Sequence, residues 1–133
     1  MKRTNLSSGA IWENKVGYSR AVRIGNVIEV SGTVSADGDK IIGEGNAYEQ
    51  TKYILAKIEA ALVTAGASLH DVIRTRMFVT DISRWEEIGR AHGEFFMSIK
   101  PATSMLQVSQ LIDPRYLIEI EATAIVHERT ASH

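Results

Sequence analysis

The sequence predicts an α+β fold in which a mixed β-sheet carries two helices on one face. Segments in which apolar and polar residues alternate, as in strands, occur in the first, middle and last parts of the 133-residue chain. Two segments with apolar residues at helical spacing lie between them. The order of strands, helix, strand, helix and two strands is typical of a sheet covered by helices. The chain is short and has no linker, so we treat residues 1–133 as a single domain.

The first strands lie in residues 20–34. Two β-rich runs flank Gly25 and Asn26, a dipeptide suited to the tight turn of a hairpin. A second turn at Asp37 and Gly38 leads into a short strand near residues 41–42.

The first helix begins after Asn46, which with Glu49 forms the pattern of a capping box. Gly66 stands where a residue in the left-handed conformation ends many helices. Between them the apolar stripe has the period of a helix and consists of Ile54, Leu55, Ile58, Leu62 and Ala65.

A strand, a helix and two further strands follow. Residues 72–80 are β-branched and alternating, and Ser83 and Glu86 form a second candidate capping box. Residues 104–108 and 117–126 read as the last two strands. The helix between them ends before Pro101, and its stripe consists of Trp85, Ile88, His92, Phe95, Phe96 and Ile99.

The last strand has two different faces. One face is apolar and should lie under the helices, and it carries Ile118, Ile120, Ala122, Ala124 and Val126. The other mixes acids with apolar groups and carries Leu117, Glu119, Glu121, Thr123 and Ile125. Two helices can cover only one face of a sheet, so we expect the other face to lie at a subunit interface of a homo-oligomer.

Composition excludes several classes of function. The chain has 15 basic and 16 acidic residues, so a broad basic face for nucleic acid is not expected. It has no cysteine, which excludes thiolate nucleophiles and cysteine-based metal sites. Its four histidines have no metal-ligand spacing, and no apolar run is long enough to span a membrane. We expect a cytoplasmic protein without a bound metal.

Four polar side chains could carry chemistry. Glu119 and Glu121 lie two residues apart and therefore share one strand face. They could be solvated or interface-paired acids, or one could be a general base with a raised pKa that orients a water molecule. Tyr18 and Arg20 share a face if their segment is extended. They could be an interface aromatic and a solvated cation, or a hydroxyl donor and an anion-binding group.

Three other candidates are assigned to packing. His92 falls on the helix stripe, where we expect a hydrogen-bonded, half-buried side chain rather than a metal ligand. Trp12 and Trp85 are expected to pack rather than to form stacking platforms for bases.

Several motifs, in order along residues 17–126, resemble the reactive intermediate deaminase family (RidA/YjgF, also called endoribonuclease L-PSP-like). The matching segments are Gly17-Tyr18-Ser19, Gly25 to Gly32, Ala65 to Leu69, Phe78 to Asp81, Pro101 to Ser104 and Ile118 to Ala122. The resemblance implies a chorismate-mutase-like fold and a homotrimer with a pocket at each subunit interface. It also implies cofactor-independent hydrolysis of small enamines and imines to keto acids and ammonia.

The resemblance further implies which residues form the pocket. Tyr18, Ser31, Phe78 and Glu119 would line it, with Glu119 positioning the attacking water and Tyr18 as its hydrogen-bond partner. Where active members carry an arginine that clamps the substrate carboxylate, this chain has Thr103.

Two more positions bear on the substrate. Met105 stands where the family usually has cysteine, and Arg20 could replace the missing clamp from another strand. A hydrogen bond to a charged group contributes about 1.5–3 kcal/mol, so the loss of the clamp predicts weak binding of 2-imino acids.

Three functions stay open at this point. The first is an enamine or imine deaminase-like hydrolase whose substrate is altered by Thr103. The second is a trimer that binds a small metabolite without catalysis. The third is a ribonuclease, against which stand the acidic balance and the absence of a paired histidine motif.

Overall fold

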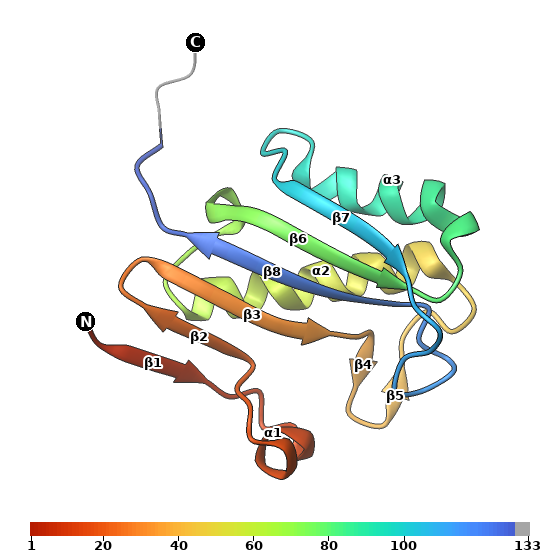
Figure 1. Ribbon diagram of the computed structural model, residues 1–133, viewed down its shortest axis with the longest axis horizontal. Coiled ribbons are helices and arrows are strands. Elements are labelled where there is room, and N and C mark those ends of the chain that lie inside the picture. The colour runs from red at the N-terminus through yellow and green to blue at the C-terminus, as the bar shows by residue number, and fades with distance from the viewer. Residues whose placement is uncertain (130–133) are drawn as a thin grey trace.

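A six-stranded mixed sheet organises residues 1–129, the part of the chain that the computed structural model describes (Figure 1). The strand order is β1-β2-β3-β8-β6-β7, in which only β6 and β7 pair in parallel. A separate two-stranded hairpin joins β4 to β5. The elements are β1 (Arg3–Leu6), α1 (Ile11–Val16), β2 (Ala21–Ile24), β3 (Val27–Thr33), β4 (Ala36–Asp37), β5 (Lys40–Ile41), α2 (Ala47–Thr64), β6 (Val72–Val79), α3 (Trp85–Phe96), β7 (Ala102–Gln107), β8 (Ile118–Ile125) and two 3₁₀ turns at Leu69–Asp71 and Ile82–Arg84.

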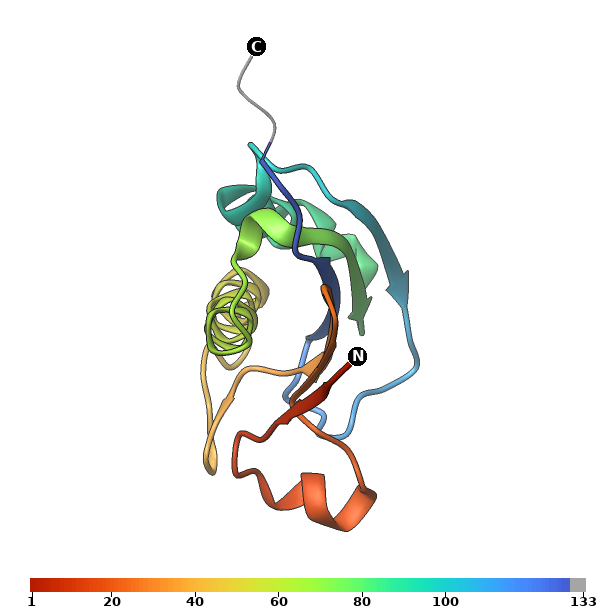
Figure 2. The same cartoon turned by 90° about the vertical axis from the view of Figure 1, so that its left-hand side faces the viewer.

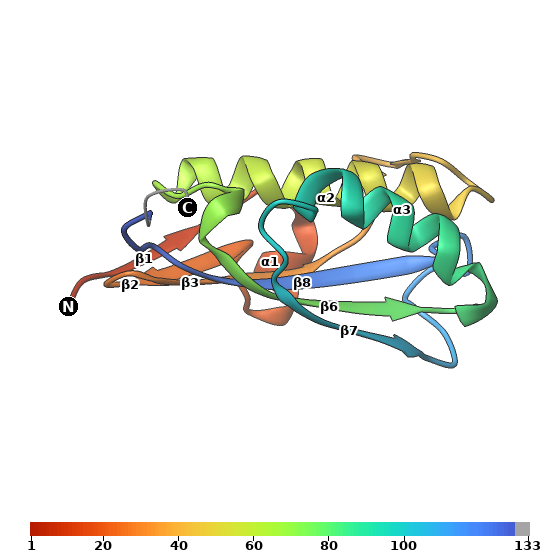
Figure 3. The same cartoon turned by 90° about the horizontal axis from the view of Figure 1, so that it is seen from above.

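Helices α2 and α3 lie side by side on one face of the sheet (Figure 3). The predicted inner face of β8 is buried from Ile118 to Ala124, and these residues join the core with Ile54, Leu55, Ile58 and Leu62 of α2. The α+β class and the two helices on a single face are therefore confirmed. No helix in residues 1–129 has both the length and the apolar character that crossing a bilayer requires.

Helix α2 begins and ends as predicted. The side chain of Asn46 accepts a hydrogen bond from the backbone N–H of Glu49 at 3.0 Å. At the other end Gly66 has φ 86°, and the N–H of Ala67 donates to the carbonyl of Leu62 at 2.8 Å. This closure satisfies carbonyl groups of the last turn and turns the chain towards β6.

The predicted start of α3 is wrong. Ser83 does not cap a helix, because Asp81 accepts hydrogen bonds from both the N–H and the hydroxyl of Ser83 and opens a 3₁₀ turn instead. An ionised carboxylate is a stronger acceptor than a hydroxyl. The assignment of the two tryptophans to packing is also wrong within the chain, since Trp12 is 51% and Trp85 57% exposed.

The N-terminal elements β1 and α1 were not predicted. Strand β1 pairs with β2 at the sheet edge, and α1 is six residues long with no side-chain cap. Helix α1 is held in place by Glu13, which is buried and accepts hydrogen bonds from the N–H and the hydroxyl of Ser8. Because the buried Glu13 is polar and the apolar residues of α1 face outward, the sequence has no amphipathic pattern that predicts this helix.

Irregular pairing at the start of β6 interrupts the alternation of buried and exposed residues along the strand. The register between β6 and β8 shifts between Val72 and Arg74. Val72 is therefore buried and Ile73 is exposed, whereas strict alternation with the buried Thr75 would give the opposite. From Arg74 onward the alternation holds, and Arg74, Arg76 and Phe78 face away from the helices while Thr75 is buried.

The left-handed residue at the end of α2 gives a test of the fold. Replacing Gly66 with alanine should lower the free energy of unfolding by about 1–2 kcal/mol, because a β-carbon disfavours this conformation. The added β-carbon would also lie only 2.9 Å from Arg23 Nη1. Denaturant unfolding measures the change.

The matched control is Gly89→Ala on the exposed side of α3, where an added β-carbon meets nothing within 4 Å. That variant should be stabilised by up to about 1 kcal/mol, because alanine favours helix more than glycine does. Equal effects of the two substitutions would contradict the assigned role of Gly66.

Candidate functional site

The sheet face opposite the helices is uncovered in the single chain. Figure 2 shows the sheet nearly edge-on with α2 on one side. Its central strands carry outward charged and polar groups, namely Glu29, Ser31, Arg74, Arg76, Glu119, Glu121 and Thr123. Apolar groups lie among them, including Val27, Phe78 and Leu106. This mixed surface contains the predicted general base and its neighbours.

Glu119 is held against the backbone of the adjacent strand. The pairing of β3 with β8 is irregular between Val30 and Thr33, and Gly32 lies inside this irregular segment. A β-carbon on Gly32 would overlap Oε2 of Glu119. The carboxylate can therefore lie on the strand only because residue 32 has no side chain.

The guanidinium of Arg20 contacts the irregular segment of β3 that contains Gly32. Its Nη2 donates to the carbonyl oxygen of Gly32 at 2.6 Å, and its Nε is buried without a partner among residues 1–129. Burial lowers the pKa of Arg20, while Tyr18, Glu13 and Glu119 act in the opposite direction. The guanidinium thus braces the backbone on which the Glu119 carboxylate rests.

The pKa of Glu119 is raised above its usual value. Burial is the largest cause, the neighbouring charge of Glu121 adds to it, and Arg20 partly offsets both. A carboxylate that binds protons more readily than usual is a suitable general base near neutral pH. The predicted sharing of one strand face by Glu119 and Glu121 is confirmed, because both project from the uncovered side of β8.

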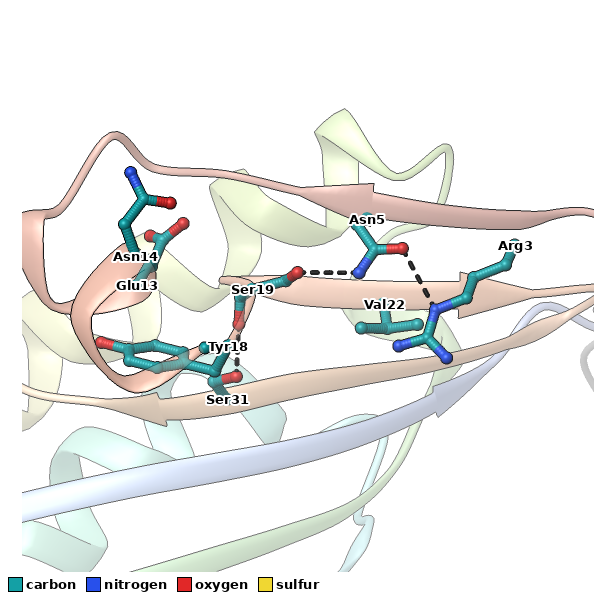
Figure 4. A pocket seen from close by; sticks show the side chains of 9 residues that line it. Arg3, Asn5, Glu13, Asn14, Tyr18, Ser19, Val22 and Ser31 are labelled. Atoms are coloured by element: carbon teal, nitrogen blue, oxygen red, sulfur yellow. Dashed lines mark hydrogen bonds between the residues drawn. The ribbon is translucent and has the colours of Figure 1, made fainter.

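Tyr18 and Ser31 line a pocket of about 470 Å³ beside α1 (Figure 4). The hydroxyl of Ser31 donates to the carbonyl of Ser19 at 2.6 Å, and the amide of Asn5 donates to the hydroxyl of Ser19 at 2.9 Å. These bonds fix the pocket wall. A second pocket of about 360 Å³ adjoins it, shares Val22 and Ser31, and reaches Glu29, Arg76 and Glu121.

Phe78 belongs to the same face. It is paired directly with Glu119 across β6 and β8, so the aromatic ring and the carboxylate project side by side. The structure therefore places Phe78 and Glu119 together on the uncovered face, and Tyr18 and Ser31 in the wall of the pocket beside α1.

Thr103 and Met105 do not join this group within one chain. In β7 they pair with Thr75 and Met77 of β6, whose side chains are buried under the helices. Paired residues of neighbouring strands project to the same face. Thr103 therefore lies on the helix side of the edge strand, and Met105 packs against the core.

The sequence predicted the environment of His92 but did not reveal the role of Gly32. The prediction for His92 is confirmed, since the half-buried ring hydrogen-bonds Thr75 Oγ1 at 2.9 Å. The role of Gly32 was missed. A glycine inside a predicted strand is a recognised sign of a bulge or a close contact, and that sign could have located it.

Comparison with known proteins shows the family to which the chain belongs. Residues 10–126 match the protein family described as Endoribonuclease L-PSP. The chain belongs to this family. Its fold is similar to the crystal structure of Rv2704 from Mycobacterium tuberculosis, a member of the YjgF/YER057c/UK114 family. That structure is 52% identical with a TM-score of 0.84, over 94% of this chain and all of the other.

Two relatives extend the comparison. A RutC family protein of Pyrococcus abyssi is 38% identical over 80% of this chain and 84% of its own. The 3-aminoacrylate deaminase RutC of Acinetobacter baylyi is 34% identical over 82% of this chain and 86% of its own. The whole core of the fold, together with Tyr18, Thr103 and Glu119, lies within the segment matched by the Endoribonuclease L-PSP family.

The contact between Gly32 and Glu119 can be tested directly. Replacing Gly32 with alanine should push the Glu119 carboxylate off the strand towards solvent, which lowers its pKa towards the value of an exposed glutamate. The pKa can be followed by carbon-13 NMR of the carboxyl groups.

Stability provides the second readout for this variant. Only the end of a flexible side chain has to move, so the unfolding midpoint should change less than it does for Gly66→Ala. An unchanged Glu119 pKa in the Gly32→Ala protein would show that the carboxylate does not depend on this contact.

Proposed function

We propose that the protein is a cofactor-independent hydrolase that removes ammonia from small enamines or imines, in pockets between the three copies of a homotrimer. The observation that carries the proposal is Glu119, a half-buried carboxylate with a raised pKa that lies against Gly32, the residue that follows Ser31 of the pocket wall. Family membership and the deaminase among the relatives support it. We assign the activity to cytoplasmic metabolite repair.

The chemistry follows from the residues around the pocket. Glu119 accepts a proton from a water molecule, whose oxygen then attacks the carbon of the C=N bond; an enamine first becomes its imine by protonation at carbon. The nitrogen takes up protons, the C–N bond breaks, and ammonia and a carbonyl product leave. The hydroxyl of Tyr18 holds the substrate or the water by a hydrogen bond.

The two-sided arrangement of the site residues supports an interface pocket. Glu119 is on the uncovered face, whereas Thr103 is on the helix side of β7. One chain cannot place both in one pocket without refolding, but the exposed edge strand β7 of a second copy could bring Thr103 to the uncovered face of the first. Apolar side chains on that face, such as Val27 and Leu106, would be removed from water.

Thr103 changes which substrates the proposed pocket would prefer. Its hydroxyl offers one neutral hydrogen bond where a guanidinium would offer two charged ones. Because Arg20 Nη2 is bound to the carbonyl of Gly32, we assign Arg20 to bracing that backbone rather than to the clamp. We therefore expect a preference for substrates that do not depend on a carboxylate.

The second candidate is a trimer that binds a small metabolite without turning it over. Thr103 favours this function, because it weakens the grip on the substrates that family deaminases use. The binding pocket would be the same.

Ribonuclease activity, which the family description suggests, is ranked below both. The uncovered face presents Glu29, Glu119 and Glu121 against only Arg74 and Arg76, so it is not the basic surface that phosphate groups require. An RNA-cleavage assay that includes a Glu119→Gln protein as the contamination control tests it, since equal cleavage by both proteins would identify a contaminant.

Ammonia release tests the catalytic proposal. The wild-type protein should accelerate ammonia release from freshly generated 3-aminoacrylate, 2-aminoacrylate or their neutral amides. Glu119→Gln should lower the rate at least about 100-fold, the usual scale of a lost general base. Glu121→Gln is the matched control, because it makes the same change on the same face but removes only the smaller cause of the raised Glu119 pKa, and it should retain far more activity than Glu119→Gln. Saturable ligand binding without any turnover would favour the binding trimer instead.

Light scattering tests the assembly. Three copies of the 14.7 kDa chain should give a particle of about 44 kDa. A well-behaved monomer at micromolar concentration would contradict the interface pocket.

A further inference from the structure

Three polar side chains form a hydrogen-bonded chain from the helix layer to an exposed strand. The Oγ1 of Thr75 on β6 lies 2.9 Å from Nε2 of His92 on α3, and it donates to Oγ1 of Thr103 on β7 at 2.7 Å. Thr75 is completely buried, and His92 packs against the ring of Phe96. Thr103, in contrast, is exposed at the outer end.

The surroundings of Thr75 are apolar. The next inward positions of β6 are Met77 and Val79, and both belong to the core. A buried hydroxyl in such surroundings has no stability advantage over valine, which has the same shape. A stabilising role therefore does not explain why three different elements contribute a polar group at this point.

Counting protons gives the hydrogen-bond chain a direction. Thr75 has one hydroxyl proton, which it donates to Thr103, so its oxygen accepts from His92. His92 must then carry a proton on Nε2. Burial lowers the pKa of His92, which favours the uncharged ring, and the hydrogen bond to Thr75 then requires the tautomer with its proton on Nε2. Thr103 keeps its own proton, for which residues 1–129 provide no acceptor.

We propose that His92 is a positioning residue that, through Thr75, orients the Thr103 hydroxyl as an outward hydrogen-bond donor for an uncharged acceptor on the ligand. The ligand class is a small molecule with a carboxamide or ketone oxygen at this position. This assignment rests on the proposed pocket and names the substrate group that Thr103 meets.

Paired ligands test the proposal by calorimetry. The probes are 2-oxobutanamide and 2-oxobutyrate, which differ only in carrying a carboxamide or a carboxylate. Wild type should bind the carboxamide more tightly. Thr75→Val and His92→Leu should weaken carboxamide binding about ten-fold, the effect of one lost hydrogen bond. They should change carboxylate binding less than two-fold, because a carboxylate finds no cation at Thr103 and does not occupy this position.

Conservative variants separate positioning from packing. Thr75→Ser and His92→Gln keep the donors and should restore carboxamide binding. Thr51→Val, a buried threonine on α2 whose hydroxyl bonds Ala47, is the control for loss of a buried hydroxyl elsewhere. If both ligands weaken equally in Thr75→Val, or if wild type shows no preference for the carboxamide, the proposal is overturned.

Nitrogen-15 NMR of labelled histidines gives a readout independent of binding. At pH 7 the His92 ring should be neutral with its proton on Nε2, and the exposed His70 provides the reference. A proton on Nδ1 would reverse the direction of the chain and overturn the proposal. Glu119→Gln should remove turnover without changing the carboxamide-to-carboxylate ratio, so failure of the hydrolase and failure of this proposal are distinguishable.

Discussion

The contact between the Glu119 carboxylate and the bare backbone of Gly32 is the constraint on which the site depends. It requires a residue without a β-carbon in the irregular segment of β3 and a brace for the carbonyl of that residue, which Arg20 provides. Lying on the strand removes the carboxylate from water, and burial raises its pKa. A backbone irregularity therefore gives a surface acid the raised pKa that the proposed general base needs.

The sheet has two faces with separate tasks. The helix side is an apolar core built by α2, α3 and the inner residues of β8, and it makes the chain stable. The other side carries the charged and aromatic groups around Glu119. The strand pairing sends Thr103 to the helix side while Phe78, on the adjacent strand, projects from the other. The proposed site is therefore larger than one chain, because no single copy presents all of its parts on one face.

The sequence predicted the features that follow from periodicity. Helix α2 with its ends at Asn46 and Gly66, and the two faces of β8, follow from spacings of 3.6 and two residues. Features set by local competition were missed. Asp81 replaced Ser83 as a cap because its carboxylate is the stronger acceptor.

Other misses depend on pairing between distant strands. The register shift after Val72 and the close approach at Gly32 arise where β8 meets its neighbours, and single-strand alternation does not contain that information. The face of Thr103 is set by the parallel pairing of β7 with β6, and the hydrogen-bonded chain from His92 through Thr75 becomes visible only once three elements are placed together.

The central claim is that the proposed site is shared between copies of the chain. Because the chain has no native cysteine, introduced cysteines can test this claim directly by crosslinking. A protein carrying both Ser31→Cys and Thr103→Cys is treated with a short bis-maleimide and separated on a denaturing gel, with each single variant as a control. If one copy supplies the uncovered face and another supplies Thr103, the double variant should give covalently linked pairs and triplets of chains. Chains that stay single, whether unlinked or linked only within themselves, would contradict a site shared between copies.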